Sequence, residues 1–302
     1  MYTQELMSAL EERSSPHVCC VMVNWNGLSD TERCLDSLCE QSYRPLTVLV
    51  VDNGSTDGSV EVIRERHPWV TVIETGRNLG FASGTNVGIR RAKEMGAEHI
   101  WLLNNDTVAA PDTLDRLVAK VGPGVGAVGT VLYAMRDGRE VQAWGGGEVK
   151  PWLAHSRHYH APRPMGRWSY LTFASVLIPM DVLVRVGILY EGFFLYFEDA
   201  DLSLRMHRHG LRLVVAEDTA VLHREGGSSA KRSPLVDQFT VTSGMRFLRR
   251  HAAVPVLSMM VFVGIKLLNR MVRLEWRNVA GVWRGVRQYV RERRTMYVET
   301  LA

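Results

Sequence analysis

A carboxylate at the end of an apolar run is the first feature of this sequence that could do chemistry. Residues 48–51 are apolar and rich in Val, which is typical of a strand buried on both faces of a parallel sheet. Asp52 ends the run, and residues 53–59 follow as a string of turn-forming residues. Open α/β sheets bind ligands at this edge, so a binding site is predicted there, although an ordinary surface turn has the same composition.

A second group of acids follows the aromatic residues 193–197. Glu198, Asp199 and Asp201 stand at the start of a predicted helix, where the helix dipole alone favours carboxylates. Asp201 can pair with Arg205 four residues later, which favours a structural role for Asp201. Apolar surroundings raise a carboxyl pKa, and this favours a functional role for Asp199.

Strands and helices alternate through the first half of the chain and would position these acids. We expect helices between successive strands, the first opened by a Ser29-to-Glu32 capping box, and strands over residues 17–24, 48–51, 70–73, 99–103 and 125–131. Right-handed crossovers would bring the strand ends at Asn24, Asp52 and Asp106 to one edge of a parallel sheet.

The second half of the chain is less regular. A hairpin is predicted near residues 137–147, a loop over residues 151–167, one strand over residues 168–178 and another over residues 211–216. His223 then opens a Gly/Ser loop suited to phosphate. His155, His158 and His160 lack an acid or Cys at ligand spacing, so a solvated or acceptor-facing loop is favoured over a metal site.

Composition indicates an ordinary globular protein of 302 residues, with 46% apolar residues and a net charge of +4. The four cysteines form no Cys-x-x-Cys pair, and we expect reduced, mostly buried thiols in a cytosolic protein. Residues 1–16 carry no hydrophobic signal region.

Positive charge gathers after residue 246. The apolar run 252–265 is shorter than the roughly 20 residues of a membrane-spanning helix. Residues 271–290 interleave Arg with apolar and aromatic residues, which is typical of an amphipathic helix on an anionic membrane surface. A helical subdomain packed on the sheet and a homodimer interface are alternatives, and nucleic acid is disfavoured because no binding motif is present.

Six motifs together resemble a known family. In chain order they are Asn24 to Gly27, Asp52 to Ser59, Asn78 to Phe81 with Asn86, Leu103 to Asp106, Phe197 to Leu202, and His223 with Gly226. The chain from about residue 18 to 229 resembles an inverting family-two glycosyltransferase of GT-A fold, closest to the rhamnosyltransferase-like branch. The resemblance implies an α/β fold with a mixed, mostly parallel sheet flanked by helices and a C-terminal helical extension. Its expected divisions are a tail (1–16), a catalytic domain (17–235) and a basic helical region (236–302).

The resemblance also implies roles at the donor site. Asp52 would accept the imide N–H of uracil or thymine in a charge-assisted hydrogen bond. The nucleotide-sugar-binding residues that it implies are Asn24, Trp25, Asn26, Asp52, Asn53, Asp57, Gly80, Asn86 and Asn105.

Metal and catalytic residues follow from the same resemblance. Asp106 stands at the metal-binding acid position, although the family's Asp-x-Asp reads Asn104-Asn105-Asp106 here. Asp106 and His223, with two phosphates and water, would complete an octahedral Mg²⁺ or Mn²⁺ site. Asp199 would be the general base, with Glu198 as the rival for that role or for holding the acceptor.

The implied activity is transfer of a sugar, with a rhamnose-like deoxyhexose favoured, from a dTDP- or UDP-sugar to an acceptor hydroxyl with inversion. The acceptor would be a cell-surface polysaccharide or a lipid-linked glycan, and the protein would lie peripherally on the inner face of the cell membrane. A nucleotidyltransferase is an alternative, but residues 24–27 lack the Lys or Arg that would grip a triphosphate. A non-catalytic nucleotide-sugar-binding module is the other alternative, and it would not need the paired acids Glu198 and Asp199.

Overall fold

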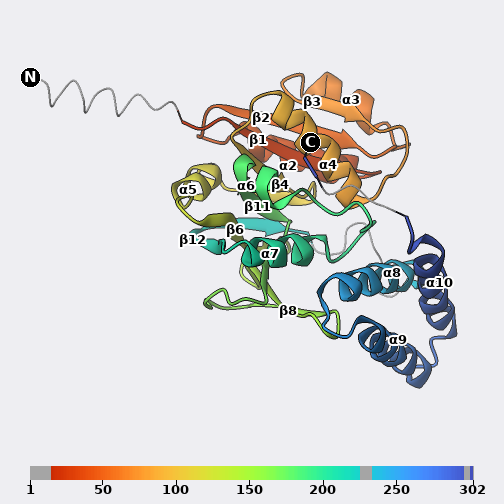
Figure 1. Ribbon diagram of the computed structural model, residues 1–302. Helices are drawn as coiled ribbons and strands as arrows, with labels where there is room; N and C mark the ends of the chain where they lie inside the picture. Colours follow the sequence, from red (N-terminus) through yellow and green to blue (C-terminus); the bar gives the residue numbers. More distant parts are fainter. Residues whose placement is uncertain (1–14, 225–232, 296–299, 302) are drawn as a thin grey trace, which may run out of the picture.

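The computed structural model describes residues 15–224, 233–295 and 300–301. Most of the expected N-terminal tail and the Gly/Ser loop 226–229 lie outside the described residues. Figure 1 shows a central sheet with helices on both faces and a group of three helices at one corner of the molecule.

The central sheet is parallel in one half and mixed in the other. Strand order is β3-β2-β1-β4-β11-β6-β12-β5, with β7 paired to β6. Strands β3, β2, β1 and β4 run parallel, whereas β11 is antiparallel to both β4 and β6. The strands are β1 (Val18–Asn24), β2 (Leu46–Asp52), β3 (Thr71–Glu74), β4 (His99–Leu103), β5 (Thr107–Ala109), β6 (Val125–Ala134), β7 (Val141–Trp144), β11 (Ser175–Pro179) and β12 (Arg212–His223). The predicted mixed α/β fold is confirmed.

Helices follow the strands as the alternating pattern predicted. They are α2 (Leu28–Cys39), α3 (Ser59–Arg66), α4 (Phe81–Glu94), α5 (Thr113–Ala119), α6 (Met180–Val186), α7 (Glu198–Arg208), α8 (Pro234–His251), α9 (Pro255–Val272) and α10 (Trp276–Glu292). The predicted capping box is wrong, because Gly27 is the N-cap of α2 and no side chain caps it. Ser29 lies inside the first turn of α2 instead.

A second sheet was not predicted. Its order is β10-β8-β9, from β8 (Gly146–Lys150), β9 (His155–His158) and β10 (Ser169–Leu171). The predicted strand over residues 168–178 is therefore two strands, β10 and β11, that belong to different sheets. The predicted loop 151–167 contains β9, whose four residues are all exposed and so show no apolar alternation.

Buried apolar residues form one cluster on each face of the central sheet. The four cysteines are free thiols, and Cys39 alone of the four is exposed. Burial raises the pKa of Cys34 to about 12 against the lowering effect of its hydrogen bonds with Thr107, so this thiol stays protonated. The prediction of reduced, mostly buried thiols agrees with this arrangement.

Helices α8 and α10 run parallel, as bonds near both ends show. Near the start of both helices the Asn278 amide donates to Asp237 at 2.6 Å, in the middle Thr242 Oγ1 donates to the Gly285 carbonyl at 3.1 Å, and near their ends Arg246 pairs with Glu292 at 2.6 Å. The group of three helices packs firmly on the remainder of the chain, since Phe247 stacks on Phe197 with ring centroids 5.2 Å apart. The expected division after residue 235 falls in the first turn of α8.

Candidate active site

The ends of β1 and β2 are joined through their last side chains. Asn24 and Asp52 face each other in register. The Asn24 amide donates to Asp52 Oδ1 at 3.0 Å and to Ser55 Oγ at 3.1 Å. The Ser55 backbone N–H donates to Asp52 Oδ2 at 2.9 Å. Each carboxylate oxygen of Asp52 retains a lone pair for a further donor.

The third strand end joins the same network. Asn105, just after β4, donates to Thr31 Oγ1 at 3.0 Å and to Asn24 Oδ1 at 3.4 Å. Thr31 in turn donates to Asn24 Oδ1 at 2.9 Å. The ends of β1, β2 and β4 therefore meet at one edge of the sheet, because these strands are neighbours and parallel.

Asp106 and His223 face each other across the pairing of β5 with β12. His223 lies opposite Thr107 in that antiparallel pair. Its Nε2 atom is 3.4 Å from Asp106 Oδ1, and each side chain is 15% exposed. Both groups can therefore be reached by a ligand.

Gln142, on β7, fixes which nitrogen of His223 points at Asp106. The Gln142 amide donates to the His223 carbonyl at 3.1 Å, so its oxygen is turned to the His223 ring. The contact of that oxygen with Nδ1, at 2.9 Å, then requires a proton on Nδ1. In neutral imidazole Nε2 carries the lone pair. Such a partner commonly orients a histidine that binds a metal.

A carboxylate oxygen and an imidazole lone pair that face each other fit a divalent cation of the Mg²⁺ or Mn²⁺ class. Within the described residues no three His, Cys, Asp or Glu side chains cluster as a complete metal site. Asp106 and His223 would therefore supply part of a coordination shell, and the rest would come from the ligand and water.

The start of α7 presents the two acids next to each other. Tyr196 and Phe197 have positive φ angles of 74° and 72°, which bulky residues seldom adopt. This backbone turns the chain sharply into α7 and fixes the direction of Glu198 and Asp199. Backbone strain of this kind is often found at functional sites.

Burial separates the behaviour of the two carboxyl groups. Glu198 is 8% exposed, and its Oε2 finds no partner among the described residues. Burial first, and then the charge of Asp199, holds the pKa of Glu198 well above its usual range. Burial raises the pKa of Asp199 to about 6, although the Ala200 N–H donates to it. Ionisation is therefore disfavoured more strongly at Glu198 than at Asp199, and Asp199 is the better candidate for a base.

Two predicted donor-site residues hold the backbone of the 75–80 segment. The Asn53 amide donates to the Gly80 carbonyl at 3.0 Å, and its oxygen accepts from Leu79 N–H at 3.2 Å. Gly80 has φ +84°, and a Cβ there would clash with the Phe194 carbonyl. Asn53 and Gly80 therefore support the backbone segment that borders the site.

Asn86 is placed differently from the prediction. It is fully buried, and both ends of its amide bond the Leu189 backbone, at 2.7 and 3.1 Å. Direct donor binding by Asn86 is therefore wrong, because no part of its amide reaches a ligand. Asn86 instead fastens the segment before α7 to α4.

Asp57 caps the start of α3 by accepting from Ser59 N–H at 3.2 Å, and it also accepts from Leu28 N–H at 3.2 Å. Burial opposes ionisation, but hydrogen bonds from Ser59 and Leu28 lower the pKa of Asp57. Trp25 is 46% exposed, and Asn26 has φ +51° with its oxygen accepting from Thr56 N–H at 2.7 Å. The indole of Trp25 is thus open to a ligand.

Sequence reasoning missed Thr31, Ser55 and Gln142. Thr31 follows Gly27 by one helical turn. This spacing could have predicted that Thr31 lies beside Gly27, and in the structure Thr31 Oγ1 is 2.9 Å from the Gly27 carbonyl oxygen. Gln142 carried no signal, since it is 81 residues from His223 in the sequence.

Comparison with known proteins identifies the family. A model described as Glycosyl transferase family 2 matches residues 19–171, half of the chain. The chain is 28% identical over 239 residues to the N-acetylglucosaminyl-diphospho-decaprenol L-rhamnosyltransferase of Mycobacterium tuberculosis, covering 70% of this chain and 77% of that protein. It is 23% identical over 212 residues to the dTDP-rhamnosyl transferase RfbF of Shigella flexneri, covering 68% of this chain and 71% of RfbF.

Solved structures share the fold. The mannosyltransferase PcManGT of Pyrobaculum calidifontis, in complex with GDP-Man and Mn²⁺, matches with a TM-score of 0.57 and 18% identity, covering 96% of this chain and 93% of that one. GalNAc-T7 with UDP, GalNAc and Mn²⁺ matches with a TM-score of 0.62 and 15% identity over 79% of this chain, which spans about half (48%) of that chain. The chain therefore belongs to glycosyl transferase family 2 and has the GT-A fold, and it is similar to rhamnosyltransferases of that family.

Proposed function

We propose that the protein transfers a sugar from a nucleoside diphosphate sugar to an acceptor hydroxyl, with inversion at the anomeric carbon. The sugar is a rhamnose-like deoxyhexose, and the donor is a dTDP- or UDP-sugar. The observation that carries the proposal is the pair Glu198 and Asp199, in which only Asp199 has a pKa, about 6, suited to a base near neutral pH. The names of the two relatives, an L-rhamnosyltransferase and a dTDP-rhamnosyl transferase, support the identity of the sugar.

The donor lies across the ends of β1, β2 and β4 in this proposal. Asp52 accepts the imide N–H of thymine or uracil, with Asn24 holding its carboxylate in place at 3.0 Å. Trp25 and Asn26 flank the base, and Asn53, Asp57, Gly80 and Asn105 support the surrounding backbone and side chains. Asn86 does not contact the donor in this proposal; it acts indirectly, by holding the segment that leads to α7.

Asp106 and His223 would hold Mg²⁺ or Mn²⁺ together with the donor phosphates. The bound cation supplies charge neutralisation for the departing nucleoside diphosphate. Gln142 keeps the proton of His223 on Nδ1, so that Nε2 stays directed at the site. Because Asn104 replaces the other acid of the family's Asp-x-Asp motif, His223 matters more for cation affinity here.

Asp199 removes the proton from the acceptor hydroxyl in the proposed step. The freed oxygen attacks the anomeric carbon while the bond to the diphosphate oxygen breaks on the opposite face, so the configuration inverts. Glu198 keeps its proton and can donate a hydrogen bond to the acceptor. A base positioned in this way contributes about 10²–10⁴-fold to the rate.

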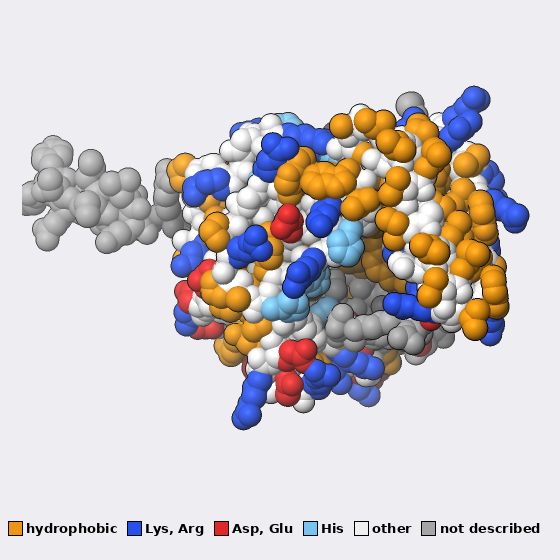
Figure 2. Space-filling view, turned by 90° about the horizontal axis from the view of Figure 1, so that it is seen from below, with side chains coloured by type: hydrophobic (Ala, Val, Ile, Leu, Met, Phe, Trp, Pro, Cys, Tyr) orange, Lys and Arg blue, Asp and Glu red, His pale blue; other side chains and the backbone are white. Residues whose placement is uncertain are grey.

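The acceptor approaches over the second sheet. A hollow of about 560 Å³ there is lined by His155, Arg157, His158 and His160, among others. The His158 ring is 6.1 Å from the ring of Tyr170, and burial together with the charge of Asp199 raises the pKa of Tyr170. Tyr170 therefore lies near His158 of the hollow and within the electrostatic influence of Asp199. Figure 2 shows histidine side chains gathered around a recess on this face of the molecule.

The decisive experiment is Asp199→Asn, measured by sugar transfer from dTDP- and UDP-sugars with and without Mg²⁺. We expect transfer to fall by about 10²–10⁴-fold while calorimetric donor affinity is kept, because the amide preserves the shape but cannot accept a proton. Glu198→Gln is the matched control and should retain most activity. Transfer at the native rate by Asp199→Asn would reject the base assignment, and pyrophosphate release from nucleoside triphosphates would indicate a nucleotidyltransferase instead.

We also propose that the protein sits on the inner face of the cell membrane and that its acceptor is carried by a lipid. The helix α9 supports this proposal. Among the described residues it alone is long and apolar enough to cross a membrane by length and composition, criteria that a buried core helix also meets, yet only 17% of it is buried. The helix extends to Val272, seven residues beyond the apolar run seen in the sequence.

A further inference from the structure

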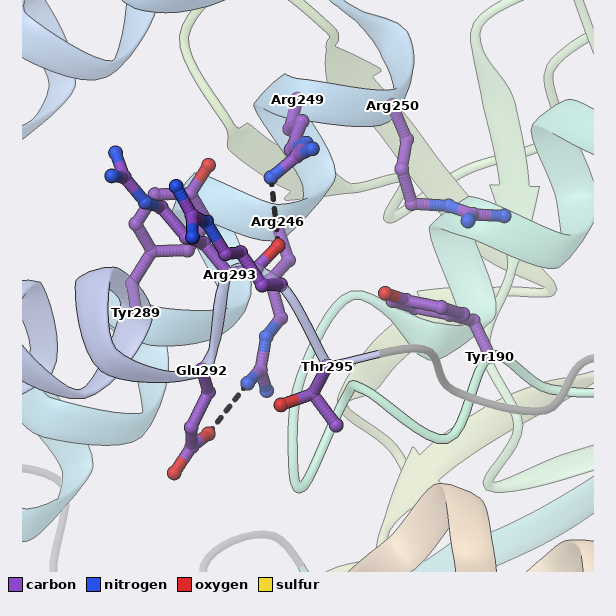
Figure 3. A pocket seen from close by; sticks show the side chains of 9 residues that line it. Tyr190, Arg246, Arg249, Arg250, Tyr289, Glu292, Arg293 and Thr295 are labelled. Atoms are coloured by element: carbon purple, nitrogen blue, oxygen red, sulfur yellow. Dashed lines mark hydrogen bonds and ion pairs between the residues drawn. The ribbon is translucent and has the colours of Figure 1, made fainter.

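A strongly basic hollow lies at one end of the group formed by α8, α9 and α10. It has a volume of about 720 Å³ and is lined mainly by the last turns of α8 and α10 and by the loop at Tyr190. Its charged lining consists of Arg246, Arg249, Arg250, Glu292, Arg293 and Arg294. Figure 3 shows Arg249 reaching the Arg293 carbonyl, Arg246 reaching Glu292, and Arg250 lying over Tyr190.

Some of the arginines already have partners that fix the walls. Arg246 pairs with Glu292 at 2.6 Å, and Arg250 pairs with Asp201 at 2.7 Å while lying 4.2 Å over the Tyr190 ring. These contacts hold Arg246 and Arg250 in place, although Asp201 is shared between Arg250 and Arg205. They form a rigid base for the remaining arginines.

Three arginines have no acidic partner within the described residues. Arg249 donates to the Arg293 carbonyl at 3.0 Å, as the dashed line in Figure 3 marks. The guanidinium groups of Arg293 and Arg294 make no hydrogen bond or ion pair in the described part of the chain, and all three residues are exposed.

Helix ends explain only part of this charge. Basic residues are favoured in the last turn of a helix because the dipole is negative there. Arg249 makes one contact of that kind, to the Arg293 carbonyl. The guanidinium groups of Arg249, Arg293 and Arg294 together carry fifteen N–H donors, and this contact uses one of them. Like charges gathered in a concave polar space repel one another unless an anion enters. Arg is the side chain best suited to phosphate oxygens, which it binds in pairs.

Apolar residues lie next to the hollow. Helix α9 begins a few residues after Arg250, and because α8 and α10 are parallel, the start of α9 lies at the same end as the hollow. Val254, Val256 and Leu257 there are 58%, 70% and 57% exposed. At this end the arginines could bind the anionic group of a lipid, while the exposed apolar side chains could contact its acyl or prenyl chain.

We propose that this hollow binds the phosphate or diphosphate group of a membrane lipid. The arginines Arg249, Arg293 and Arg294 take the phosphate oxygens, and the lipid chain lies along the start of α9. The site is separate from the pair Asp106 and His223, and its occupation does not depend on sugar transfer.

Inorganic pyrophosphate is the probe, titrated calorimetrically into the full chain with EDTA present so that no cation supports binding at Asp106. We expect saturable binding that weakens at least about tenfold in Arg249→Gln/Arg294→Gln, because charged hydrogen bonds are lost. The single change Arg294→Glu, at an exposed position, should have a similar effect and guards against misfolding of the double variant.

The matched control is Arg139→Gln/Arg185→Gln, which removes the same charge from two exposed arginines outside the hollow. It should keep the native affinity, as should Asp106→Ala, which removes the proposed cation ligand. No binding by the native chain, equal loss in the Arg139 control, or loss in Asp106→Ala would each overturn the site.

Competition in detergent micelles then identifies the lipid. Displacement of pyrophosphate by farnesyl diphosphate would assign the site to a prenyl diphosphate carrier, and displacement by phosphatidylglycerol would assign it to a bilayer phospholipid. Either result supports a lipid phosphate site. Displacement by neither would overturn it.

Discussion

Asp199 is the residue whose protonation decides when the proposed reaction can run. Burial raises its pKa to about 6, so the carboxylate is present above that pH and the inactive carboxylic acid below it. We expect kcat/KM for transfer to rise about tenfold per pH unit below 6 and to level off near pH 7, as for a single essential base. A pH–rate profile checks this.

Glu198→Gln is the control for that profile. Burial and the charge of Asp199 hold the pKa of Glu198 well above its usual range, so the amide should leave the apparent pKa in place. A profile that stays flat between about pH 5 and 8, or that flattens only in Glu198→Gln, would assign the base elsewhere.

Gln142 is a positioning residue whose effect should appear in cation affinity. Because it holds the Nδ1 proton of His223, Gln142→Ala should weaken Mn²⁺ binding in the presence of UDP by about 10–100-fold, the usual range for partners of this type. Calorimetry measures this directly. Arg139→Gln, in the turn between β6 and β7, is the neighbouring control, and equal Mn²⁺ affinity in Gln142→Ala would exclude the role.

Single residues differed in how far the sequence could place them. Asp52 and Asp106 end apolar runs, so their position at the sheet edge followed from the pattern. Asn86 was misplaced because a buried amide that bonds Leu189, 103 residues away, looks in the sequence like one that faces a ligand. Gln142 lacks any local pattern, since only the pairing of β6 with β7 brings it to His223.

The helix α7 is tied to α8 through one buried carboxylate. Asp201 is fully buried and pairs with Arg205 at 2.9 Å, Arg250 at 2.7 Å and His251 at 2.8 Å. Burial opposes ionisation, but the bond from His251 and the charges of Arg205 and Arg250 hold the pKa of Asp201 well below its usual range. The contact therefore fixes both α7 and the wall of the basic hollow.

Asp201→Asn should destabilise the protein by about 3–5 kcal/mol, because it leaves two arginines without their buried counter-charge. Urea unfolding at pH 7 measures this. The stabilisation is present above the unfolded pKa of about 3.9 and is lost as pH falls toward the lower folded value, so the two proteins should converge in stability in acid. Glu94→Gln, which breaks an exposed ion pair, should lower the free energy of unfolding by less than about 1 kcal/mol. A similarly small loss in Asp201→Asn would contradict the proposed role of Asp201 in holding α7 to α8.

Elements were predictable where burial left a clear pattern. β1, β2 and β4 are mostly apolar because both of their faces are covered, and each was placed within two residues of its true bounds. β9 is exposed along its whole length, and no Gly or Pro separates β10 from β11 in the sequence although the two strands enter different sheets. Pairing between strands that are distant in the sequence determined the position of β9 and the separation of β10 from β11. No local sequence pattern reveals such pairing.

The molecule as a whole has an apolar surface that the described residues do not cover. Residues of α9 at helical spacing share one exposed face, among them Leu257, Met260 and Leu268 at 57%, 67% and 61%. The charged Arg270 turns inward, where it pairs with Asp237 at 2.8 Å. Figure 2 shows hydrophobic side chains gathered over this part of the surface. Soluble proteins seldom expose an apolar face of this extent.

Membrane binding of the full chain is the corresponding prediction. Arginines on and beside α10, including Arg273, Arg277, Arg284 and Arg287, are exposed. Each arginine near an anionic surface contributes about 1 kcal/mol. We therefore expect co-sedimentation with phosphatidylglycerol vesicles, weaker binding to phosphatidylcholine vesicles, and a decline with added salt.

The apolar face of α9 should supply the rest of the binding free energy. Leu257→Gln/Met260→Gln/Leu268→Gln removes three of its exposed side chains and should reduce vesicle binding by at least about tenfold, because burying each such side chain is worth about 1.5–3 kcal/mol. Val184→Gln, an exposed apolar residue on α6, is the control and should bind as the native chain does. Equal partition to neutral and anionic vesicles would reject the electrostatic contribution, and undiminished binding by the triple variant would show that α9 does not enter the lipid.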